Sequence, residues 1–576
     1  MHEKTLKLSQ LIHTIVHQSD TFFSTINDRL QKHITAMTTL LTFCLLFLQL
    51  EPPPAILASI TPEKLRSHIA VLAHDSLQGR GPASAGDRKA TAYIISQFKK
   101  FGLAPAGENS TYIQKVPMVG ITVDPATQLM IGNKKQTINL AYSTEFVATT
   151  GTYEPTITIK DAELVFVGYG IVAPEQNWND YKDVDVKGKI LVMMNNDPSS
   201  DDPNFFAGKG RTYYGRWTYK YEIAAERGAL GAIVIHTTPS AGYRYEVIQN
   251  SWSREMFDLD EKTPGNRLAL KAWTSEQATK KFLALAGYSL DSLTALAELR
   301  SFKPIPLGVT LSTTMRSEVK RLETNNIIGK VEGSDPVLQK QYIIFTAHYD
   351  HFGIGRPING DSIYNGAMDN ASGTSMMLNL AEAFSMAKEK PKRSLLFSAV
   401  AAEEQGLLGS KYYANNPTVP ASTIAANINT DVINVIGKTS DISWQGSDRS
   451  SLGIDLARVA AAMGLTVVPD LAPEQGGFFR SDHFSFAKVG IPAMSMGGGK
   501  NFPGVDTSFV RTMRERSGKN YHQPSDEISS DWNFDGALQQ AEIVIRVAWR
   551  IANNIEIPYW NKGSEFESVR KRSLQQ

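Results

Sequence analysis

The sequence predicts an α/β fold in which helices flank a central sheet, with a second, β-rich region elsewhere in the chain. Three observations support this prediction. Short apolar stretches with the length of strands alternate with helical stretches, acidic and histidine side chains follow directly after several strands, and 576 residues exceed one ordinary hydrophobic core. The chain should therefore form two or more domains.

The first half of the chain contains predicted elements of two parts. Two helical patterns, at residues 61–75 and 87–101, come first, and a strand-rich stretch at 117–150 follows that the sequence does not assign to either part. The expected elements of the second part are strands at 162–171, 186–194 and 228–236 and a helix at 221–227. His236 ends the last of these strands, and we expect it to be structural.

The first candidate site residues follow a predicted buried strand. Residues 342–347 are mostly β-branched or aromatic, and His348 comes directly after them. Open α/β sheets bind ligands beyond the carboxyl ends of their strands. Asp350 lies two residues further on, where its carboxylate can accept the second ring N–H of His348. The alternative is a structural histidine at the end of a strand.

Asp369 lies in a loop before a helix predicted at 374–387. Its carboxylate has two oxygens, so it can bridge two metal ions. The alternative is that this loop only caps the helix, which is common for Asp and Asn.

Glu403 and Glu404 follow a predicted strand at 393–401 and precede a helix at 407–415. Two adjacent glutamates in one dry pocket would repel each other, and a metal cation would remove that conflict. Glu404 can bind the cation, while Glu403 can hold the proton taken from a metal-bound water. The alternative is a solvated acidic helix start, which the helix dipole favours.

Two more candidates come from the last third of the chain. Asp431 lies inside an alternating strand predicted at 426–433, where a buried carboxylate costs several kcal/mol unless it is paired or metal-bound. His522 stands in a polar loop at 520–526. The remaining expectations are a strand at 325–331, a closing helix at 531–554 and a polar end at 564–576 that frays.

Five motifs in this order resemble the M28 family of co-catalytic zinc peptidases, over roughly residues 60–554 of the chain. They are AHYD (347–350), MDNASG (368–373), EEQG (403–406), NTD (429–431) and YHQPSD (521–526). The resemblance implies a zinc-peptidase-like (phosphorylase/hydrolase-like) fold with a mixed central sheet and an inserted protease-associated (PA) domain.

The resemblance also implies a role for each residue. Two Zn²⁺ ions per chain would share Asp369, and Glu403 would be the general base. The other implied ligands are His348 and Asp431 on one ion and Glu404 and His522 on the other, with Asp350 orienting His348. The implied activity is that of a zinc-dependent exopeptidase, foremost an aminopeptidase, which removes N-terminal residues from peptide substrates with a water activated by both ions.

One segment departs from the family pattern. Members often carry a tyrosine just before Arg-Ser-Asp-His, where its hydroxyl can steady the oxyanion; this chain has Phe478 and Phe479. A phenyl ring has no donor, so the oxyanion donor is open. We expect Asp482 and His483 to be structural neighbours of the site. His351 is expected to be a wall residue.

Three alternatives to the aminopeptidase prediction stay open. One is a carboxypeptidase or dipeptidase of the same family. Another is a glutaminyl-cyclase-like acyltransferase on the same fold, which would use one zinc ion. The third is a non-catalytic binding protein. A complete set of ligands for two ions, together with Glu403, favours the peptidase.

Composition limits the partners and the compartment. The balance of 59 basic and 58 acidic side chains, without a basic stripe, speaks against nucleic acid. The only cysteine, Cys44, excludes an intramolecular disulfide. It lies in an uncharged apolar run at 34–50, which predicts export to the periplasm or medium or, alternatively, a membrane anchor. Oligomeric state is not predicted.

The predicted domain organisation combines these observations. Residues 1–59 form a signal peptide or anchor, and residues 556–576 form a polar tail. The expected folded parts are 60–145 and 306–555 for the peptidase domain and 146–305 for the inserted PA domain.

Overall fold

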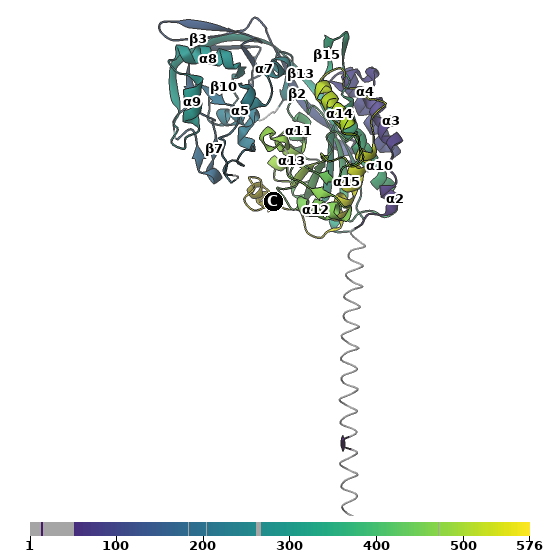
Figure 1. Ribbon diagram of the computed structural model, residues 1–576. Helices are drawn as coiled ribbons and strands as arrows, with labels where there is room; N and C mark the ends of the chain where they lie inside the picture. The colour runs from purple at the N-terminus through teal and green to yellow at the C-terminus, as the bar shows by residue number, and fades with distance from the viewer. Residues whose placement is uncertain are drawn as a thin grey trace, which may run out of the picture.

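The computed structural model describes residues 13–14, 51–182, 184–202, 204–260, 267–470 and 472–575. The apolar run at 34–50, predicted as a signal or anchor, lies outside these ranges. Among the described residues, no helix is both long and apolar enough to span a bilayer. The described chain folds into two lobes that lie side by side (Figure 1).

The larger lobe is built on the predicted mixed central sheet. Its strands run in the order β21 (Ala493–Ser495), β18 (Ile424–Asn429), β14 (Tyr342–His348), β17 (Ser394–Val400) and β13 (Ile305–Val331). The first four are parallel neighbours, whereas β13 pairs antiparallel with β17. The mixed α/β sheet expected from the sequence is therefore confirmed.

Alternating side chains bury both faces of this sheet. Ile343 and Phe345 of β14 belong to one apolar cluster, whereas Ile344 belongs to another on the opposite face. Phe345 stacks on Phe397 of β17 with ring centroids 4.9 Å apart. Burying one such ring contributes about 1.5–3 kcal/mol. The strands are short continuous apolar runs because neither face meets water.

Helices cover both faces (Figure 1). Those packed on the first cluster are α3 (Pro62–Leu72), α4 (Ala85–Lys100), α10 (Gly373–Met386), α12 (Leu452–Ala462) and α15 (Asp535–Asn553). The second cluster is covered by α11 (Leu408–Asn415) and α13 (His483–Lys488).

The smaller lobe, residues 124–316, is the inserted lobe. Its sheet places β6 (Thr156–Phe166), β9 (Ile190–Met194), β10 (Gly231–Ile235) and β12 (Leu270–Thr274) in parallel order, with β5 (Phe146–Thr149) antiparallel at the edge. The antiparallel hairpin β3 (Gln128–Gly132) and β4 (Thr137–Ala141) also belongs to it. Its separate core includes Leu129 and Leu140, which precede the predicted domain boundary at 146.

The inserted lobe has more helix than the sequence predicted. The expected helix at 221–227 is α5 (Trp217–Glu226). Three further helices of eight or more residues were not predicted: α7 (Tyr245–Trp252), α8 (Glu276–Leu285) and α9 (Leu290–Ala297). Each has only eight to ten residues, so its apolar pattern covers only two to three turns of the sequence.

One long strand joins the lobes. β13 has 27 residues. Its first half pairs with β6 and β3 of the inserted lobe, and its second half pairs with β2 (Ile113–Val123) and β17. The predicted strand at 325–331 is only the last part of it.

Two sequence-based expectations are wrong. Asp431 does not lie inside a strand: β18 ends at Asn429, and all six of its residues are buried. The polar end does not fray from residue 564, because it forms α16 (Glu567–Ser573). The aromatic side chain of Phe566 is buried against Phe478 and Trp560 and anchors that helix.

Candidate metal centre

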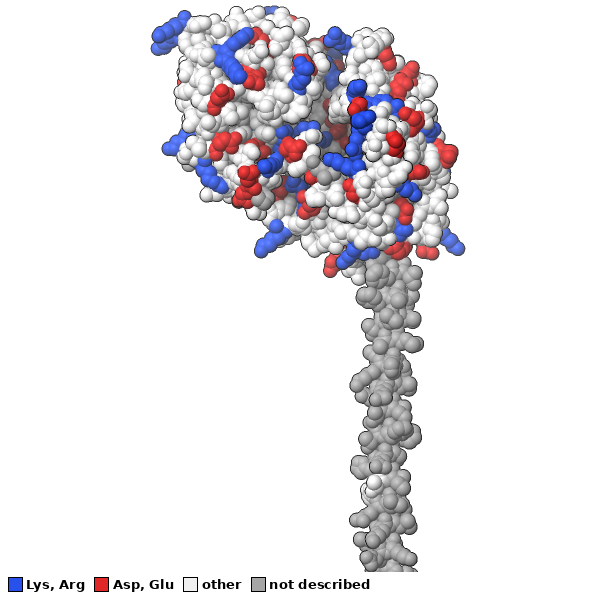
Figure 2. All heavy atoms as spheres, in the orientation of Figure 1, with Lys and Arg blue, Asp and Glu red and all other residues white. Residues whose placement is uncertain are grey.

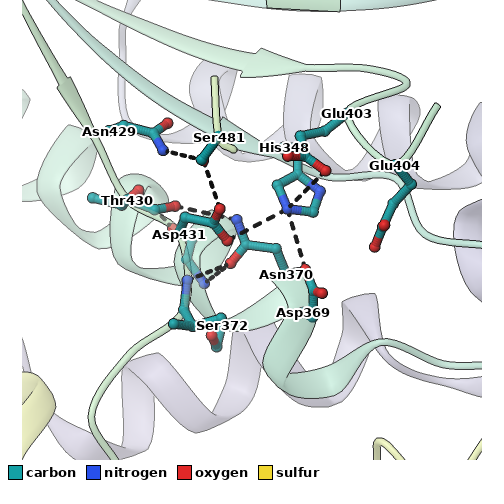
Figure 3. A network of polar contacts seen from close by, with 12 residues as sticks. His348, Asp369, Asn370, Ser372, Glu403, Glu404, Asn429, Thr430, Asp431 and Ser481 are labelled. Atoms are coloured by element: carbon teal, nitrogen blue, oxygen red, sulfur yellow. Dashed lines mark hydrogen bonds and ion pairs between the residues drawn. The ribbon is translucent and has the colours of Figure 1, made fainter. Parts of the chain in front are cut away.

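The candidate site lies at the carboxyl ends of three adjacent parallel strands. His348 is the last residue of β14, Glu403 and Glu404 follow β17, and Asp431 follows β18. In this arrangement the strand-end loops meet in one crevice. Figure 3 shows His348 pointing toward Asp369 and Asp431, with Glu403 and Glu404 beside it.

Asp369 connects the two halves of the site. It comes from the turn η6 (Ala367–Ser372) before α10. Its Oδ1 lies 3.2 Å from His348 Nε2 and its Oδ2 lies 3.3 Å from His522 Nε2. Asn370, rather than Asp369, accepts the backbone N–H of Gly373 at the start of α10, at 2.8 Å. The carboxylate of Asp369 is therefore left to face both histidines.

The other predicted ligands complete two groups. Asp431 Oδ1 lies 3.5 Å from His348 Nε2, and Glu404 Oε2 lies 3.3 Å from His522 Nε2. His522 follows α14 (Thr507–Asn520), far along the chain from the strand ends. The structure thus brings together all five residues expected to bind metal. The candidate donor groups among the described residues are His348–Asp369–Asp431, His351–Asp369–Glu404 and His348–Glu403–Glu404.

His351 has a more direct contact than the expected wall residue. Its Nδ1 lies 2.7 Å from Glu404 Oε1. Burial lowers the pKa of His351 to about 4, so the ring is neutral and its Nδ1 shares a hydrogen bond with the carboxyl group of Glu404. His351 therefore fixes one oxygen of Glu404 while the other faces His522.

Asp350 orients its neighbours differently from the expectation. The nearer acceptor for His348 Nδ1 is the main-chain oxygen of Asp350 at 3.3 Å, whereas the carboxylate Oδ1 is 3.8 Å away. That carboxylate accepts the backbone N–H of Glu403 at 3.0 Å and of Glu404 at 3.4 Å. Asp350 therefore holds both the histidine and the glutamate pair.

The carboxylates of the site are too close to one another to be ionised together without a cation. Burial raises the pKa of Glu403 well above its ordinary value and that of Glu404 to about 8. Burial alone would also raise the pKa of Asp369, but hydrogen bonds from His348 and His522 hold it well below the usual range. Imidazole nitrogens and carboxylate oxygens that surround a buried point are zinc donors, so the donor set fits zinc.

Three further residues hold the ligand loops. Arg80 is fully buried and donates to four main-chain oxygens, including those of Tyr349 and Gly366 beside the site. Asp526 accepts the backbone N–H of Asp369 at 3.0 Å, and Ser481 Oγ donates to Asp431 Oδ2 at 2.6 Å. Arg80 could not be recognised from the sequence, because three of these four oxygens belong to residues far along the chain, Tyr349, Asn365 and Gly366.

Asp482 and His483 lie behind the site, as expected of structural neighbours. Both are fully buried, and neither belongs to a candidate donor group among the described residues. Burial raises the pKa of Asp482 to about 7 and lowers that of His483 to about 3. Burial therefore disfavours the charged form of both side chains, and His483 is neutral near pH 7.

Tyr521 is a site residue that the sequence reasoning missed. Phe478 and Phe479 are buried in an apolar cluster, where Phe478 packs on the ring of His483. Tyr521 instead stacks on His522 with ring centroids 3.7 Å apart. A tyrosine hydroxyl is protonated near pH 7, so it can donate a hydrogen bond beside the site. The signal was present, since Tyr521 opens the motif that contains His522.

With this geometry established, comparison with known proteins identifies the family. Residues 326–546 match the family model described as peptidase family M28. These residues form an M28 peptidase domain. The M28 domain contains all five expected ligands, Glu403 and Tyr521, whereas the inserted lobe lies before it.

The curated relatives include a protein named as a leupeptin-inactivating enzyme and one named as an aminopeptidase. The chain is 27% identical over 253 residues to leupeptin-inactivating enzyme 1 of Streptomyces exfoliatus, which covers 42% of this chain and 51% of that protein. It is 27% identical over 259 residues to aminopeptidase Y of Saccharomyces cerevisiae, which covers 43% of each protein. The chain thus spans about half the length of these curated relatives.

A solved structure covers more of the chain. An aminopeptidase from Aneurinibacillus sp. strain AM-1 aligns with 87% of this chain and 97% of its own, at a TM-score of 0.48 and 22% identity.

Proposed function

We propose that the protein is a zinc-dependent exopeptidase, foremost an aminopeptidase that removes N-terminal residues from peptides. One observation carries the proposal: the two oxygens of Asp369 lie 3.2 and 3.3 Å from two different histidines. A carboxylate placed in this way can be shared by two cations. The M28 domain and its similarity to a protein named aminopeptidase Y support the same conclusion.

The proposed cofactor is two Zn²⁺ ions per chain. His348, Asp369 and Asp431 would hold one ion, and Asp369, Glu404 and His522 would hold the other. When bound, zinc supplies Lewis-acid polarisation of the peptide carbonyl and a lowered pKa for an attacking water. The protein supplies the positions of its carboxylates and imidazoles, which His351, Asp350 and Ser481 fix by hydrogen bonds.

Glu403 is the proposed general base. Its Oε2 lies 4.0 Å from His348 Nε2, close to the donor groups, while its backbone is held by Asp350. A carboxylate at this place can accept a proton from the attacking water and deliver it to the leaving amine. Glu403 does not need to bind metal, because the other residues fill both groups.

Tyr521 is the proposed donor to the carbonyl oxygen. The tyrosine expected before Arg480 is replaced by Phe478, which is buried against other apolar side chains. Tyr521 stacks on His522 and is 61% exposed, so a substrate can reach it. A protonated hydroxyl there can donate to an oxygen on which negative charge develops.

A cavity beside Asp369 fits the side chain of the N-terminal residue. Its volume is about 500 Å³. Apolar side chains form much of its lining, among them Met368, Val432, Ile433 and Tyr521. We therefore propose that a large apolar N-terminal residue such as leucine is preferred.

The inserted lobe reaches the site and is proposed to be a PA domain that shapes access to it. The guanidinium of Arg254 lies 4.2 Å from the ring centroid of Phe352. Phe352 in turn packs on His522 at 4.6 Å between ring centroids. Export, or anchoring by residues 34–50, is also proposed, from the apolar run alone.

A peptide panel tests the proposed function. The full chain, loaded with zinc, is incubated with leucine p-nitroanilide, with free peptides and with the same peptides blocked at the amine. We expect free amines to be cleaved and blocked ones spared, with activity lost to a chelator and two zinc ions found per chain. Equal cleavage of blocked peptides would contradict the aminopeptidase assignment. One zinc ion per chain would contradict the shared site.

A further inference from the structure

Three arginines meet where the inserted lobe touches the M28 domain. Arg211 and Arg216 flank the turn η4 (Tyr213–Gly215) before α5, and Arg480 ends the turn η9 (Gly477–Phe479) of the M28 domain. We call these three residues the arginine cluster. They come from two lobes, so they are neighbours only in the folded chain.

Contacts between the lobes hold the cluster in place. The backbone N–H of Arg211 donates to Pro473 O at 3.0 Å. The Cδ of Arg211 lies only 3.0 Å from the position that a Cβ on Gly476 would take, so a side chain there would be crowded. Gly476 directly precedes the turn that ends at Arg480. The loop of the inserted lobe and the loop that carries Arg480 therefore pack as one surface.

The cluster holds more positive charge than its surroundings neutralise. Arg211 donates one hydrogen bond, from Nη2 to Ser240 O at 2.7 Å, but its buried Nε has no partner. The buried Nε of Arg216 also has none. Burial and then the charge of Arg480 lower the pKa of Arg216 to about 10. Guanidinium groups that repel one another and retain unused buried donors are suited to an anion.

The nearest carboxylates do not pair with the arginine cluster. Asp197 accepts the backbone N–H of Thr212 at 2.8 Å, and its charge acts first on the buried amine of Lys220 and then on Arg211, with which it forms no ion pair among the described residues. Glu403 is near enough for its charge to act on Arg216, but it is the proposed general base. Among the described residues, no ion pair of Arg211, Arg216 or Arg480 with a carboxylate is formed.

The place of the cluster shows which part of a substrate it would meet. It lies toward Glu403, and Ser481 next to Arg480 donates to Asp431. The apolar cavity of about 500 Å³ lies on the flank of Asp369, Val432 and Tyr521. A peptide whose first side chain occupied the cavity would extend its remaining part toward the arginines. Figure 2 shows basic side chains gathered along the hollow between the two lobes.

We propose that the arginine cluster binds a carboxylate on the leaving-group side of the cleaved bond, an inference that rests on the proposed exopeptidase function. Guanidinium forks pair with carboxylates through two parallel hydrogen bonds. The carboxylate can be the C-terminus of a dipeptide or an acidic side chain in the second residue. The first source makes the protein selective for dipeptides, and the second makes it selective for sequence.

Three substrates distinguish these sources. The zinc-loaded full chain is assayed with Leu-Gly, Leu-Gly-amide and Leu-Glu-amide, and leucine p-nitroanilide serves as a reference. We expect KM to be about tenfold or more lower for a substrate with a suitable carboxylate than for Leu-Gly-amide, since a charge-assisted hydrogen bond has this strength. A gain for Leu-Gly alone identifies the C-terminal carboxylate, and a gain for Leu-Glu-amide alone identifies the side chain.

Variants connect the effect to the cluster. In Arg216→Gln the KM ratio between the amide and the carboxylate substrate should fall to about one, and Arg480→Gln should reduce it as well. Arg244→Gln is the matched control, because Arg244 lies in the same lobe but is 80% exposed and paired with Glu246. Arg480 is exposed, so its variant remains informative if Arg216→Gln does not fold.

Two negative results differ in meaning. If leucine p-nitroanilide is not hydrolysed by the zinc-loaded protein, the proposed function itself is wrong. If it is hydrolysed but neither carboxylate substrate has a lower KM than Leu-Gly-amide, only the carboxylate subsite is wrong. The subsite is also wrong if Arg216→Gln and Arg480→Gln keep the KM ratio of the unmodified protein.

Discussion

Both lobes place ionisable residues beyond the ends of parallel strands, yet within the described ranges only the M28 domain gathers them into a candidate metal centre. In the inserted lobe, Asp197 follows β9 and His236 follows β10. Asp197 is hydrogen-bonded to Thr212 and lies near the buried amine of Lys220. His236 packs among aromatic rings, and burial lowers its pKa. Its structural role was expected from the sequence.

The difference between the lobes is charge balance. Around Asp369 several carboxylates share a buried space with imidazoles, and among the described residues none of these carboxylates forms an ion pair with a lysine or arginine. The charge of the buried Arg80 acts on Asp369 and Glu404, but its hydrogen bonds go to main-chain oxygens, and this one cation is outnumbered by the carboxylates of the site. Around Asp197 a lysine supplies the opposite charge from within the fold. A strand-end acid therefore indicates a metal site only when the chain itself does not neutralise it.

The largest expected effect comes from Asp369→Asn. An amide binds cations more weakly than a carboxylate, and this residue serves both donor groups, so both zinc ions should be held more weakly and hydrolysis of leucine p-nitroanilide should be lost. Zinc content by atomic absorption and activity of the same sample measure both effects. An Asp369→Asn protein that kept two ions and full activity would refute the shared position. Asp197→Asn is the control in the other lobe and should leave zinc content unchanged.

Glu403→Gln should lower kcat roughly a hundredfold to ten-thousandfold while the zinc content stays the same, because an amide cannot carry the proton. Steady-state kinetics and metal analysis measure the two effects separately. Loss of zinc together with activity would instead assign Glu403 to the metal shell. Activity equal to that of the unmodified protein would exclude it as the base.

Tyr521→Phe should lower kcat by roughly tenfold to a thousandfold, because one donor to the developing negative charge is lost while the stacked ring remains. KM should change little. Phe478→Tyr is the companion variant. Added to Tyr521→Phe, it should not restore kcat, because the side chain at position 478 is buried. An unchanged kcat in Tyr521→Phe would show that another group donates.

The smallest expected effect on catalysis comes from Lys220→Met, although its effect on folding is large. The variant leaves the buried charge of Asp197 without the opposite charge of the lysine, and it removes the hydrogen bonds from Lys220 to Tyr169 O and Asn196 O. We expect the free energy of unfolding to fall by about 3–5 kcal/mol, measured by chemical denaturation. At low temperature, hydrolysis of leucine p-nitroanilide should stay within a few-fold of that by the unmodified protein. A second substitution, Asp197→Asn, should recover part of the stability.

The sequence predicted much of this site because each ligand stands next to a strong local pattern. His348 follows an apolar strand, and Glu403 and Glu404 follow another, so their meeting at one sheet edge could be expected. Asp431 was placed wrongly in a strand because Val432 and Ile433 prolong the apolar pattern after β18 has ended. The alternation of apolar and polar residues predicts a strand but does not show at which residue it ends.

Other residues could not be found from local patterns. Arg80 holds the site through main-chain oxygens of residues that are nearly three hundred positions away, and His351 was recognised only through its contact with Glu404. The arginine cluster joins residues of two lobes. Each of these depends on packing between residues that are distant in the sequence. The spacing of motifs along the chain cannot predict such contacts.

The continuous strand β13 also limits how the chain can be divided. Residues up to Arg316 form ladders with the inserted lobe, and the next residue, Ser317, begins the ladder with β2. A truncation at residue 306 would strip the partners from the first half of this strand and expose its backbone donors and acceptors, which invite pairing between molecules. A linker that replaces residues 124–316 would keep the whole ladder between β2 and β13, but it would also remove β11 (Met256–Leu259), which pairs with the other edge of β2.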